Sequence, residues 1–199
     1  MRPTARTVHS LRKATVTARV ALAIIGLTLS ACGSRVAPPP APPEDAGAGL
    51  RAAAVIELTS DDVASDALDA DELRALLEDA GFESAVERSY SGPNRAVRRV
   101  DVRVVRFSTE GGAERYLSWL QDHVEEVIGQ ADPAAALETP PTSVFLHLPG
   151  GCCPRDPSVA LAAWRDGRDV LRVIVSGPGA DGDTASTFIV SIERWWEGS

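Results

Sequence analysis

The sequence predicts an α+β fold in which helices pack mainly on one face of an antiparallel sheet. Three patterns carry this prediction: a helix signalled at both ends over 69–82, alternating valines at 100, 102 and 104, and an Asp166-Gly167 turn between two apolar runs. The expected elements follow one another in the order α-β-β-α-β-β-β-α. Helices placed before, between and after antiparallel strands are typical of a sheet covered by helices.

The helices are indicated by their end signals and by apolar residues at helical spacing. Asp69 and Glu72 have the spacing of a capping box, and Gly81 suits the left-handed position that ends a helix. A second helix is expected over 108–129, where a Ser-Thr cap precedes apolar residues spaced by three and four. The third is expected over 184–196, against the preference of its β-branched residues.

Five strands are expected between these helices. The stretches 82–90 and 96–107 flank the turn-rich SGPN and predict an antiparallel hairpin. Another strand is expected at 143–148, and 159–175 predicts a second hairpin because Asp-Gly favours a tight turn. Alternate residues point to opposite faces, so the valines of the first hairpin predict one buried face.

Residues 1–31 have the composition of an export signal. Their first nineteen residues hold five basic side chains and no acidic one, and the apolar run Val20–Leu29 follows. Ten apolar residues are too few to span a bilayer, which takes about twenty. An ordinary signal peptide, cut after a small residue, is one interpretation of this segment.

Leu29-Ser30-Ala31-Cys32 resembles the lipobox of bacterial lipoproteins. The resemblance implies that Cys32 carries a diacylglyceryl group and becomes the mature N-terminus. It also implies export by the general secretory route, and a protein anchored to the outer face of the cytoplasmic membrane. The partner of Cys32 is then the cell membrane itself.

Three parts of the chain are therefore expected. The signal peptide covers 1–31. Lipidated Cys32 and a stalk rich in proline, alanine and glycine cover 32–52, and a single globular domain covers 53–199. After the signal peptide the chain has 28 acidic residues against 15 arginines, a net charge near −13. Such a charge argues against a nucleic-acid partner.

Cys152 and Cys153 are adjacent in a stretch that also contains glycine and proline. An exported protein meets an oxidising compartment, so we expect a vicinal disulfide between them. The alternatives are a bridge to another molecule, unpaired buried thiols, and a redox or metal role. Metal binding through the cysteines with His147 and Asp156 lacks any usual ligand spacing, so no metal or other cofactor is expected.

Two sets of side chains are candidates for a binding surface. Tyr116, Trp119 and His123 share one flank of the second helix, and an arginine-rich ribbon follows the first hairpin. The ribbon consists of Arg88, Arg95, Arg98, Arg99, Arg103 and Arg106. Arg99 and Arg103 share the face opposite the valines, and such side chains hold carboxylates or phosphates. The alternatives are rings that pack on the sheet, and a solvated strand face paired with Asp101, Glu83 or Glu87.

The segment VRVVRFSTEGGAERYLSWL resembles one in secreted actinobacterial lipoproteins of unassigned role, through Arg106-Phe107 and the pattern Ala113-Glu114-Arg115-Tyr116-Leu117. Some of these lipoproteins, and the extracytoplasmic sensor domains of certain mycobacterial kinases, have sandwich folds related to the PsbP and Mog1 proteins. The resemblance covers about Leu73 to Trp196, and implies no catalytic residue.

No motif of a Ser hydrolase, P-loop enzyme or zinc protease occurs in the sequence. We therefore expect a non-catalytic domain that binds a small ligand, a lipid or an envelope protein outside the cytoplasmic membrane. The alternative is an extracytoplasmic redox protein, or another enzyme, that uses the Cys152-Cys153 pair.

Overall fold

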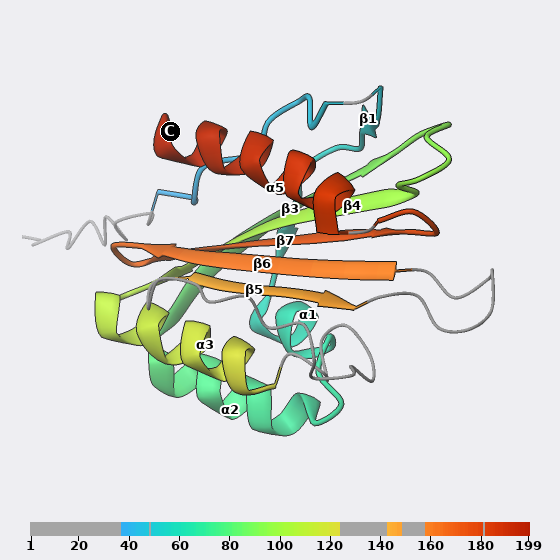
Figure 1. The fold of residues 1–199 in the computed structure, drawn as a ribbon. Helices are drawn as coiled ribbons and strands as arrows, with labels where there is room; N and C mark the ends of the chain where they lie inside the picture. Colours follow the sequence, from blue (N-terminus) through green and yellow to red (C-terminus); the bar gives the residue numbers. More distant parts are fainter. Residues whose placement is uncertain (1–36, 48, 124–142, 149–157, 181) are drawn as a thin grey trace, which may run out of the picture. The chain divides into compact units, whose positions relative to one another are not determined.

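The computed structural model describes residues 37–47, 49–123, 143–148, 158–180 and 182–199. These residues form one sheet and four helices (Figure 1). In chain order the elements are β1 (Arg51–Ala52), β2 (Ile56–Leu58), α1 (Ser60–Ala64), α2 (Ala70–Ala80), β3 (Phe82–Ser91), β4 (Arg99–Phe107), α3 (Glu110–Asp122), β5 (Ser143–Leu148), β6 (Ser158–Asp166), β7 (Asp169–Gly177) and α5 (Gly182–Glu197). Within these ranges no helix has both the length and the apolar character to cross a membrane.

The sheet has seven strands in the order β1-β3-β4-β7-β6-β5, and β2 also pairs with β3. Every pair of neighbouring strands is antiparallel. The β3–β4 and β6–β7 hairpins meet where β4 pairs with β7 over eight residues, Arg99–Arg106. The predicted α+β class with an antiparallel sheet is confirmed.

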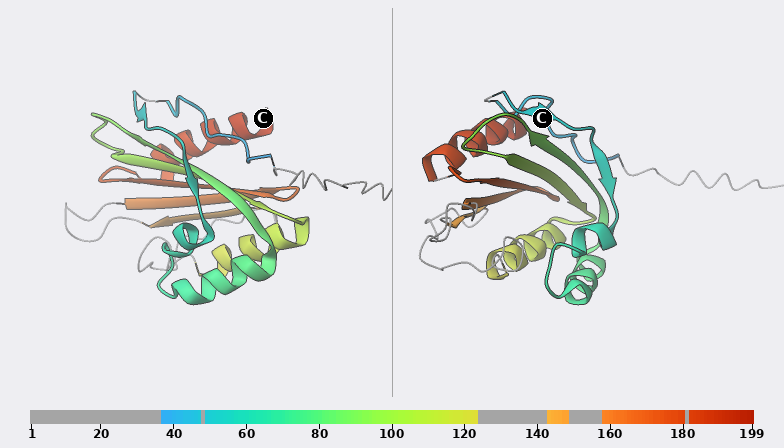
Figure 2. Two further views of the ribbon diagram at one scale, coloured as in Figure 1. Left: turned by 180° about the vertical axis from the view of Figure 1, so that it is seen from behind. Right: turned by 90° about the vertical axis from the view of Figure 1, so that its right-hand side faces the viewer.

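Helices cover both faces of this sheet, three on one face and one on the other. α1, α2 and α3 enclose one apolar core, which includes Leu77, Phe107 and Leu120. α5 encloses the second core, in which Phe188 and Ile192 pack on the valines of β4 and β7. Figure 2 shows the two helical layers on opposite sides of the curved sheet. Most helices therefore share one face, as predicted, but α5 does not.

The predicted caps at Asp69, Gly81 and Thr109 are confirmed, whereas α3 ends at Asp122, and residues 124–129 of that predicted helix lie outside the described residues. The Asp69 side chain accepts a hydrogen bond from the Glu72 N–H at 3.0 Å, and Gly81 ends α2 with a φ of 76°. Thr109 is the cap of α3. The turn of the β6–β7 hairpin lies one residue later than the predicted Asp166-Gly167. Asp166 still pairs with Asp169, so the turn residues are Gly167 and Arg168, and Gly167 has a φ of 54°. Glycine takes this left-handed conformation without strain.

Three short elements before α2 were not expected from the sequence. β1 and β2 pair in succession with one edge of β3. Thr59 is the N-cap of α1. Its hydroxyl accepts from the Asp62 N–H, and the Asp62 carboxylate accepts from the Thr59 N–H. This reciprocal cap allows a helix of five residues to bury Val63 completely.

The N-terminal segment (residues 37–47 and 49–52) differs from the predicted stalk. It packs on the α5 side of the sheet (Figures 1 and 2), where Ala46 is 1% exposed and Leu50 6%. A proline-rich segment has few N–H donors to satisfy, so it can lie on a domain if its carbonyls find partners. The domain boundary predicted at 53 is therefore too late.

Those carbonyls do find partners, on residues far along the chain. The Tyr90 hydroxyl donates to the Pro43 carbonyl at 2.5 Å. Arg106 donates to the carbonyls of Ala37 and Pro38 at 2.7 and 3.1 Å, and the same guanidinium forms a forked pair with Asp169. Burial raises the pKa of Tyr90 to about 12, so its hydroxyl stays a donor at neutral pH.

We predict that Leu50→Ala destabilises the full chain in mild detergent by about 2–4 kcal/mol, as expected for a buried leucine. Ile56→Ala is the matched control, because Ile56 is 51% exposed on the neighbouring edge. It should change the free energy of unfolding by no more than about 0.5 kcal/mol. Chemical denaturation measures both. Equal, small effects of the two substitutions would show that the N-terminal segment does not pack on the domain.

Candidate functional site

A row of charged side chains crosses the middle of the sheet, beneath α1, α2 and α3. Glu87 of β3 lies opposite Arg103 of β4, and Arg103 lies opposite Arg172 of β7. They share a face with Val105 and Phe107, which pack on the helices. Arg103 is 5% exposed and Arg172 3%. Two positive charges thus lie side by side, with little water to screen them.

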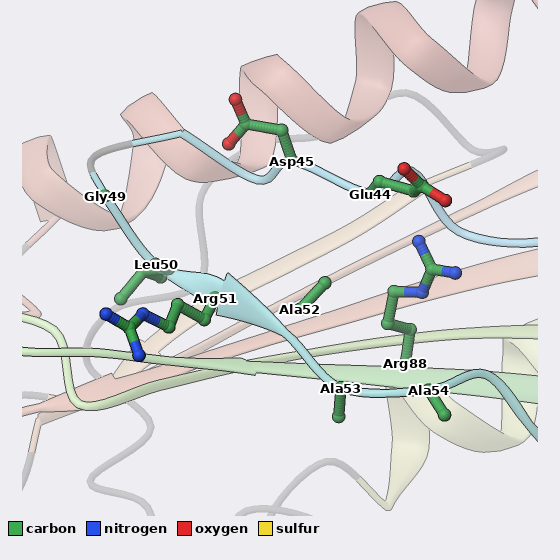
Figure 3. A pocket seen from close by; sticks show the side chains of 9 residues that line it. All are labelled: Glu44, Asp45, Gly49, Leu50, Arg51, Ala52, Ala53, Ala54 and Arg88. Carbon is green, nitrogen blue, oxygen red and sulfur yellow. The ribbon is translucent and has the colours of Figure 1, made fainter.

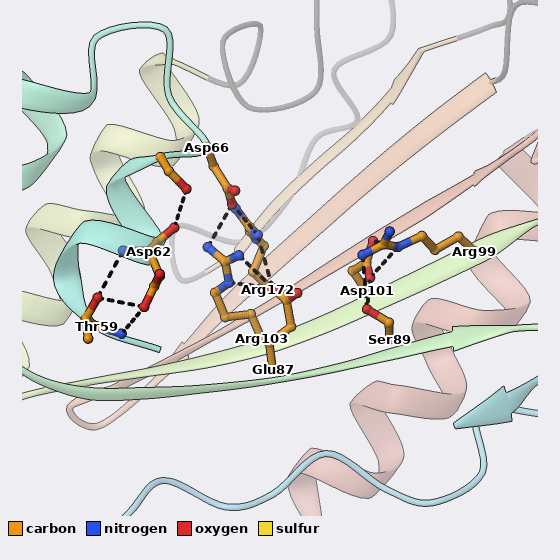
Figure 4. Close-up of polar contacts among 10 residues, drawn as sticks. Thr59, Asp62, Asp66, Glu87, Ser89, Arg99, Asp101, Arg103 and Arg172 are labelled. Carbon is orange, nitrogen blue, oxygen red and sulfur yellow. Dashed lines mark hydrogen bonds and ion pairs between the residues drawn. The ribbon is translucent and has the colours of Figure 1, made fainter. Parts of the chain in front are cut away.

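Two carboxylates neutralise these guanidinium groups (Figure 4). The Arg103 Nε donates to Glu87 Oε2 at 2.7 Å, and its Nη2 lies 2.6 Å from the same oxygen. One oxygen of Asp66, Oδ2, lies 2.7 Å from both Arg103 Nη1 and Arg172 Nη2. Asp66 belongs to the turn between α1 and α2. The ion pairs therefore tie this turn to β4 and β7.

Burial and charge act against each other on the titratable groups of this cluster. Burial would raise the pKa of Asp66, but the charges of Arg172 and Arg103 outweigh it and hold that pKa below its ordinary value. Burial raises the pKa of Tyr116, and the same arginines only reduce that rise. At neutral pH, Asp66 is therefore ionised and Tyr116 is protonated.

The ion cluster (Asp66, Glu87, Arg103 and Arg172) is balanced in charge. Both carboxylates face guanidinium groups, which do not release a proton in the physiological range. A general base instead needs a free lone pair and a proton donor within reach. The arrangement stabilises the position of the α1–α2 turn, and we assign it a structural role.

Only some of the residues that the sequence places on a binding surface are accessible to solvent. Tyr116 is 1% exposed and Arg103 belongs to the ion cluster, so the prediction that these two residues line an accessible surface is wrong. Their burial depends on the helices that cover them, which alternation along one strand does not reveal. Arg99 is exposed, and its guanidinium pairs with Asp101 at 2.7 Å. That pair matches the alternative of a solvated, paired strand face.

Trp119 and His123 pack on each other along α3. Their rings stack with centroids 4.7 Å apart and planes 7° from parallel. The His123 Nδ1 lies 3.0 Å from the Trp119 carbonyl oxygen, and Trp119 is only 6% exposed. Trp119 also belongs to the core between α3 and the sheet, which matches the alternative of a ring that packs on the sheet. This leaves His123, which is partly exposed, as the accessible member of the predicted set on α3.

The three cysteines lie outside the described residues. Lipidation of Cys32 and a disulfide between Cys152 and Cys153 therefore stay predictions from the sequence. The described part of the chain contains no group of three or more histidine, cysteine, aspartate or glutamate side chains arranged to hold a metal ion.

A polar depression of about 710 Å³ lies on the other face of the sheet, between the N-terminal segment and β3 (Figure 3). Glu44, Asp45 and Arg51 line it from the segment, and Arg88 lines it from the sheet. The Nε and Nη1 atoms of Arg88 are buried and have no hydrogen-bond partner among the described residues. Arg103 Nη1 also lacks a hydrogen bond of good geometry, but it lies 2.7 Å from Asp66 Oδ2, whereas Arg88 forms no ion pair among the described residues.

Strand alternation places Arg88 and Arg106 on the face of the sheet opposite to Arg99 and Arg103. Val86, Arg88 and Tyr90 point to the α5 face, and Arg88 pairs with Val102 of the same face. Arg99 and Arg103 point to the other face. The six arginines therefore do not form one patch. Arg106 is paired with Asp169 and with carbonyls of the N-terminal segment, whereas Arg88 lies beneath that segment without an ion pair among the described residues.

Comparisons by sequence found no match, and a comparison of structures found similar folds. No family model matches the chain, and no curated protein matches it. One similar solved structure is the crystal structure of the extracellular domain of PknH from Mycobacterium tuberculosis, with a TM-score of 0.48 and 15% sequence identity. The match covers 73% of this chain and 84% of that chain. Nothing about function follows from a likeness of this degree.

We predict that Asp66→Asn destabilises the protein by about 1–3 kcal/mol at pH 7, because it leaves Arg172 and Arg103 short of one buried counter-charge. A carboxyl whose folded pKa is lowered contributes stability above its unfolded pKa, near 3.9, and loses it as pH falls through the folded value. The difference between variant and wild type should therefore shrink below about pH 4. Denaturant unfolding at pH 7, 5 and 3 measures this trend.

Asp71→Asn is the control for this prediction. Asp71 also pairs with an arginine, Arg74, but its side chain is 93% exposed. Exposed ion pairs contribute little to stability, so the variant should unfold like wild type. An Asp66→Asn protein as stable as Asp71→Asn at pH 7 would contradict a structural role for the ion cluster.

Proposed function

We propose that this chain is a lipoprotein held at the outer face of the cytoplasmic membrane, whose α+β domain binds a ligand or partner without catalysing a reaction. The single observation that supports binding is Arg88, a partly exposed side chain at a polar depression whose buried Nε and Nη1 atoms have no hydrogen-bond partner among the described residues. The anchor is supported by the sequence around Cys32, where an apolar run ends in a lipobox-like tetrapeptide.

A non-catalytic role is supported by how the buried acids are used. Asp66 and Glu87 both neutralise arginines of the ion cluster, which leaves neither of them available for proton transfer. The proposal covers a small ligand, a lipid or an envelope protein as the bound molecule. The competing proposal, redox chemistry at Cys152 and Cys153, depends on two adjacent thiols in an exported chain.

We predict that Cys32→Ala removes the membrane anchor. Wild-type protein should be recovered in the membrane fraction with a diacylglyceryl group on its N-terminal cysteine, as intact mass would show. Two acyl chains give a stable anchor where one is marginal. The variant should remain unprocessed or be released, and Ser34→Ala, the control, should behave like wild type. A Cys32→Ala protein that is cut at the wild-type bond and still sediments with membranes would refute the anchor.

We predict that Cys152 and Cys153 form a disulfide in protein taken from its native compartment. Reduction should raise the intact mass by two hydrogen atoms and expose two thiols to alkylation. Because the ring is so short, removing it with Cys152→Ser should cost well under the roughly 2–4 kcal/mol of long-loop disulfides. Two alkylated thiols before any reduction would contradict the prediction and reopen the alternative of unpaired thiols.

A further inference from the structure

Arg88 occupies a gap in the hydrogen-bonded edge of the sheet. β2 pairs with β3 as far as Glu87, and β1 pairs with β3 from Tyr90 onward. Between these two pairings, Ala53 donates to the Ser89 carbonyl at 2.8 Å. Arg88 projects from this gap to the α5 face, towards the part of the N-terminal segment that carries Glu44 (Figure 3).

The charge of Arg88 is not matched by a carboxylate in the described part of the chain. The two buried arginines, Arg103 and Arg172, each form ion pairs shorter than 3 Å. The neighbour of Arg88 is instead the Tyr90 hydroxyl, whose proton is given to the Pro43 carbonyl. Arg88 is partly exposed, but its Nε and Nη1 atoms are shielded from solvent, and the hydration that these two atoms lose is not replaced by a protein acceptor.

The rim of the depression holds carboxylates that do not reach this cation. Glu44 and Asp45 are both exposed and line the same depression, but neither forms an ion pair with Arg88 in the described structure. Asp45 is instead engaged with the backbone, since its Oδ1 accepts from the Gly47 N–H at 2.7 Å. The depression therefore combines an unpaired positive charge below with two negative charges on its rim.

We propose that this depression binds a small organic or inorganic anion, with Arg88 as the residue that recognises its carboxylate or phosphate group. The inference rests on the proposed binding function, and names the site and the ligand class for it. Arg88 lines the depression, and two of its nitrogens have no acceptor among the described residues, so an anion oxygen bound there would have donors that the protein leaves unused. Charge-assisted hydrogen bonds of this kind are about twice as strong as neutral ones.

Tyr90 acts as a positioning residue for Arg88. It is fully buried, it lies two residues further along the same face of β3, and its hydroxyl is held by the Pro43 carbonyl. The hydroxyl can therefore accept from the guanidinium while it donates to the N-terminal segment. This arrangement fixes the cation under the depression without neutralising it, as an anion site requires.

The test uses the full chain in mild detergent and two probes, sodium acetate and sodium phosphate, each compared with sodium chloride at equal ionic strength. One probe should raise the melting temperature saturably, by about 3–6 °C at ten times its dissociation constant. Acetate and phosphate distinguish a carboxylate from a phosphate ligand. Phosphate also stabilises proteins without binding to a site. The shift in melting temperature that is due to binding is therefore taken as the difference between wild type and Arg88→Met.

Arg88→Met should abolish the saturable shift while leaving the ligand-free protein about as stable as wild type, because the removed guanidinium forms no ion pair among the described residues. Arg98→Met is the matched control. Arg98 belongs to the same arginine ribbon but is exposed and does not line the depression, so its variant should keep the shift. Equal shifts in wild type and Arg88→Met, or no saturable shift with either probe, would overturn the proposal.

Glu44→Gln separates the proposal from an internal ion pair. Removing a negative charge from the rim should tighten anion binding about two- to tenfold, since like charges repel at short range. If Glu44 instead closes on Arg88 in solution, the wild type should show no saturable shift with either probe, and Glu44→Gln and Arg88→Met should both destabilise the ligand-free protein. Those results would show that Arg88 forms an internal ion pair with Glu44 and does not bind an anion.

These results are independent of the membrane anchor. A protein that fails the Cys32 test but shows an Arg88-dependent shift keeps the anion site and loses the lipoprotein assignment. A protein that is lipidated but shows no shift keeps the anchor and loses the anion site.

Discussion

Two guanidinium groups buried side by side impose the main constraint on this structure. Arg103 and Arg172 face each other across β4 and β7, and the apolar core around them gives little screening. Glu87 supplies one counter-charge from β3, but the second has to come from outside the sheet. Asp66 supplies it from the turn between α1 and α2. The position of both helices is therefore coupled to a charge requirement at the centre of the sheet.

The parts of the fold that could be predicted from sequence are those with local signals. Asp69 and Gly81 mark the ends of α2, and the alternating valines of β4 distinguish its two faces. The N-terminal segment has no such signal, because its burial depends on Tyr90 and Arg106, which lie 47 and 69 residues beyond their partners Pro43 and Ala37. Contacts at this range leave no local pattern in a proline-rich stretch.

The candidate site shows the same division between local pattern and long-range contact. Alternation correctly places Arg99 and Arg103 on one face, but only the α1–α2 turn decides that Arg103 is buried while Arg99 is not. Likewise, the position of Arg88 beside Tyr90 follows from strand parity. That it lies under a depression follows from the N-terminal segment above it, whose course no local signal predicts.

The attachment of the N-terminal segment also determines how the domain responds to a mechanical pull from upstream. Force applied before Ala37 would first reach the two carbonyls held by Arg106, then the Pro43 carbonyl held by Tyr90, and then the pairing of β1 with β3. These contacts are arranged in series, so they would break one after another at low force, as in peeling. Arg88 would be uncovered at an early stage of this process, while the β3–β4–β7 centre of the sheet stayed folded.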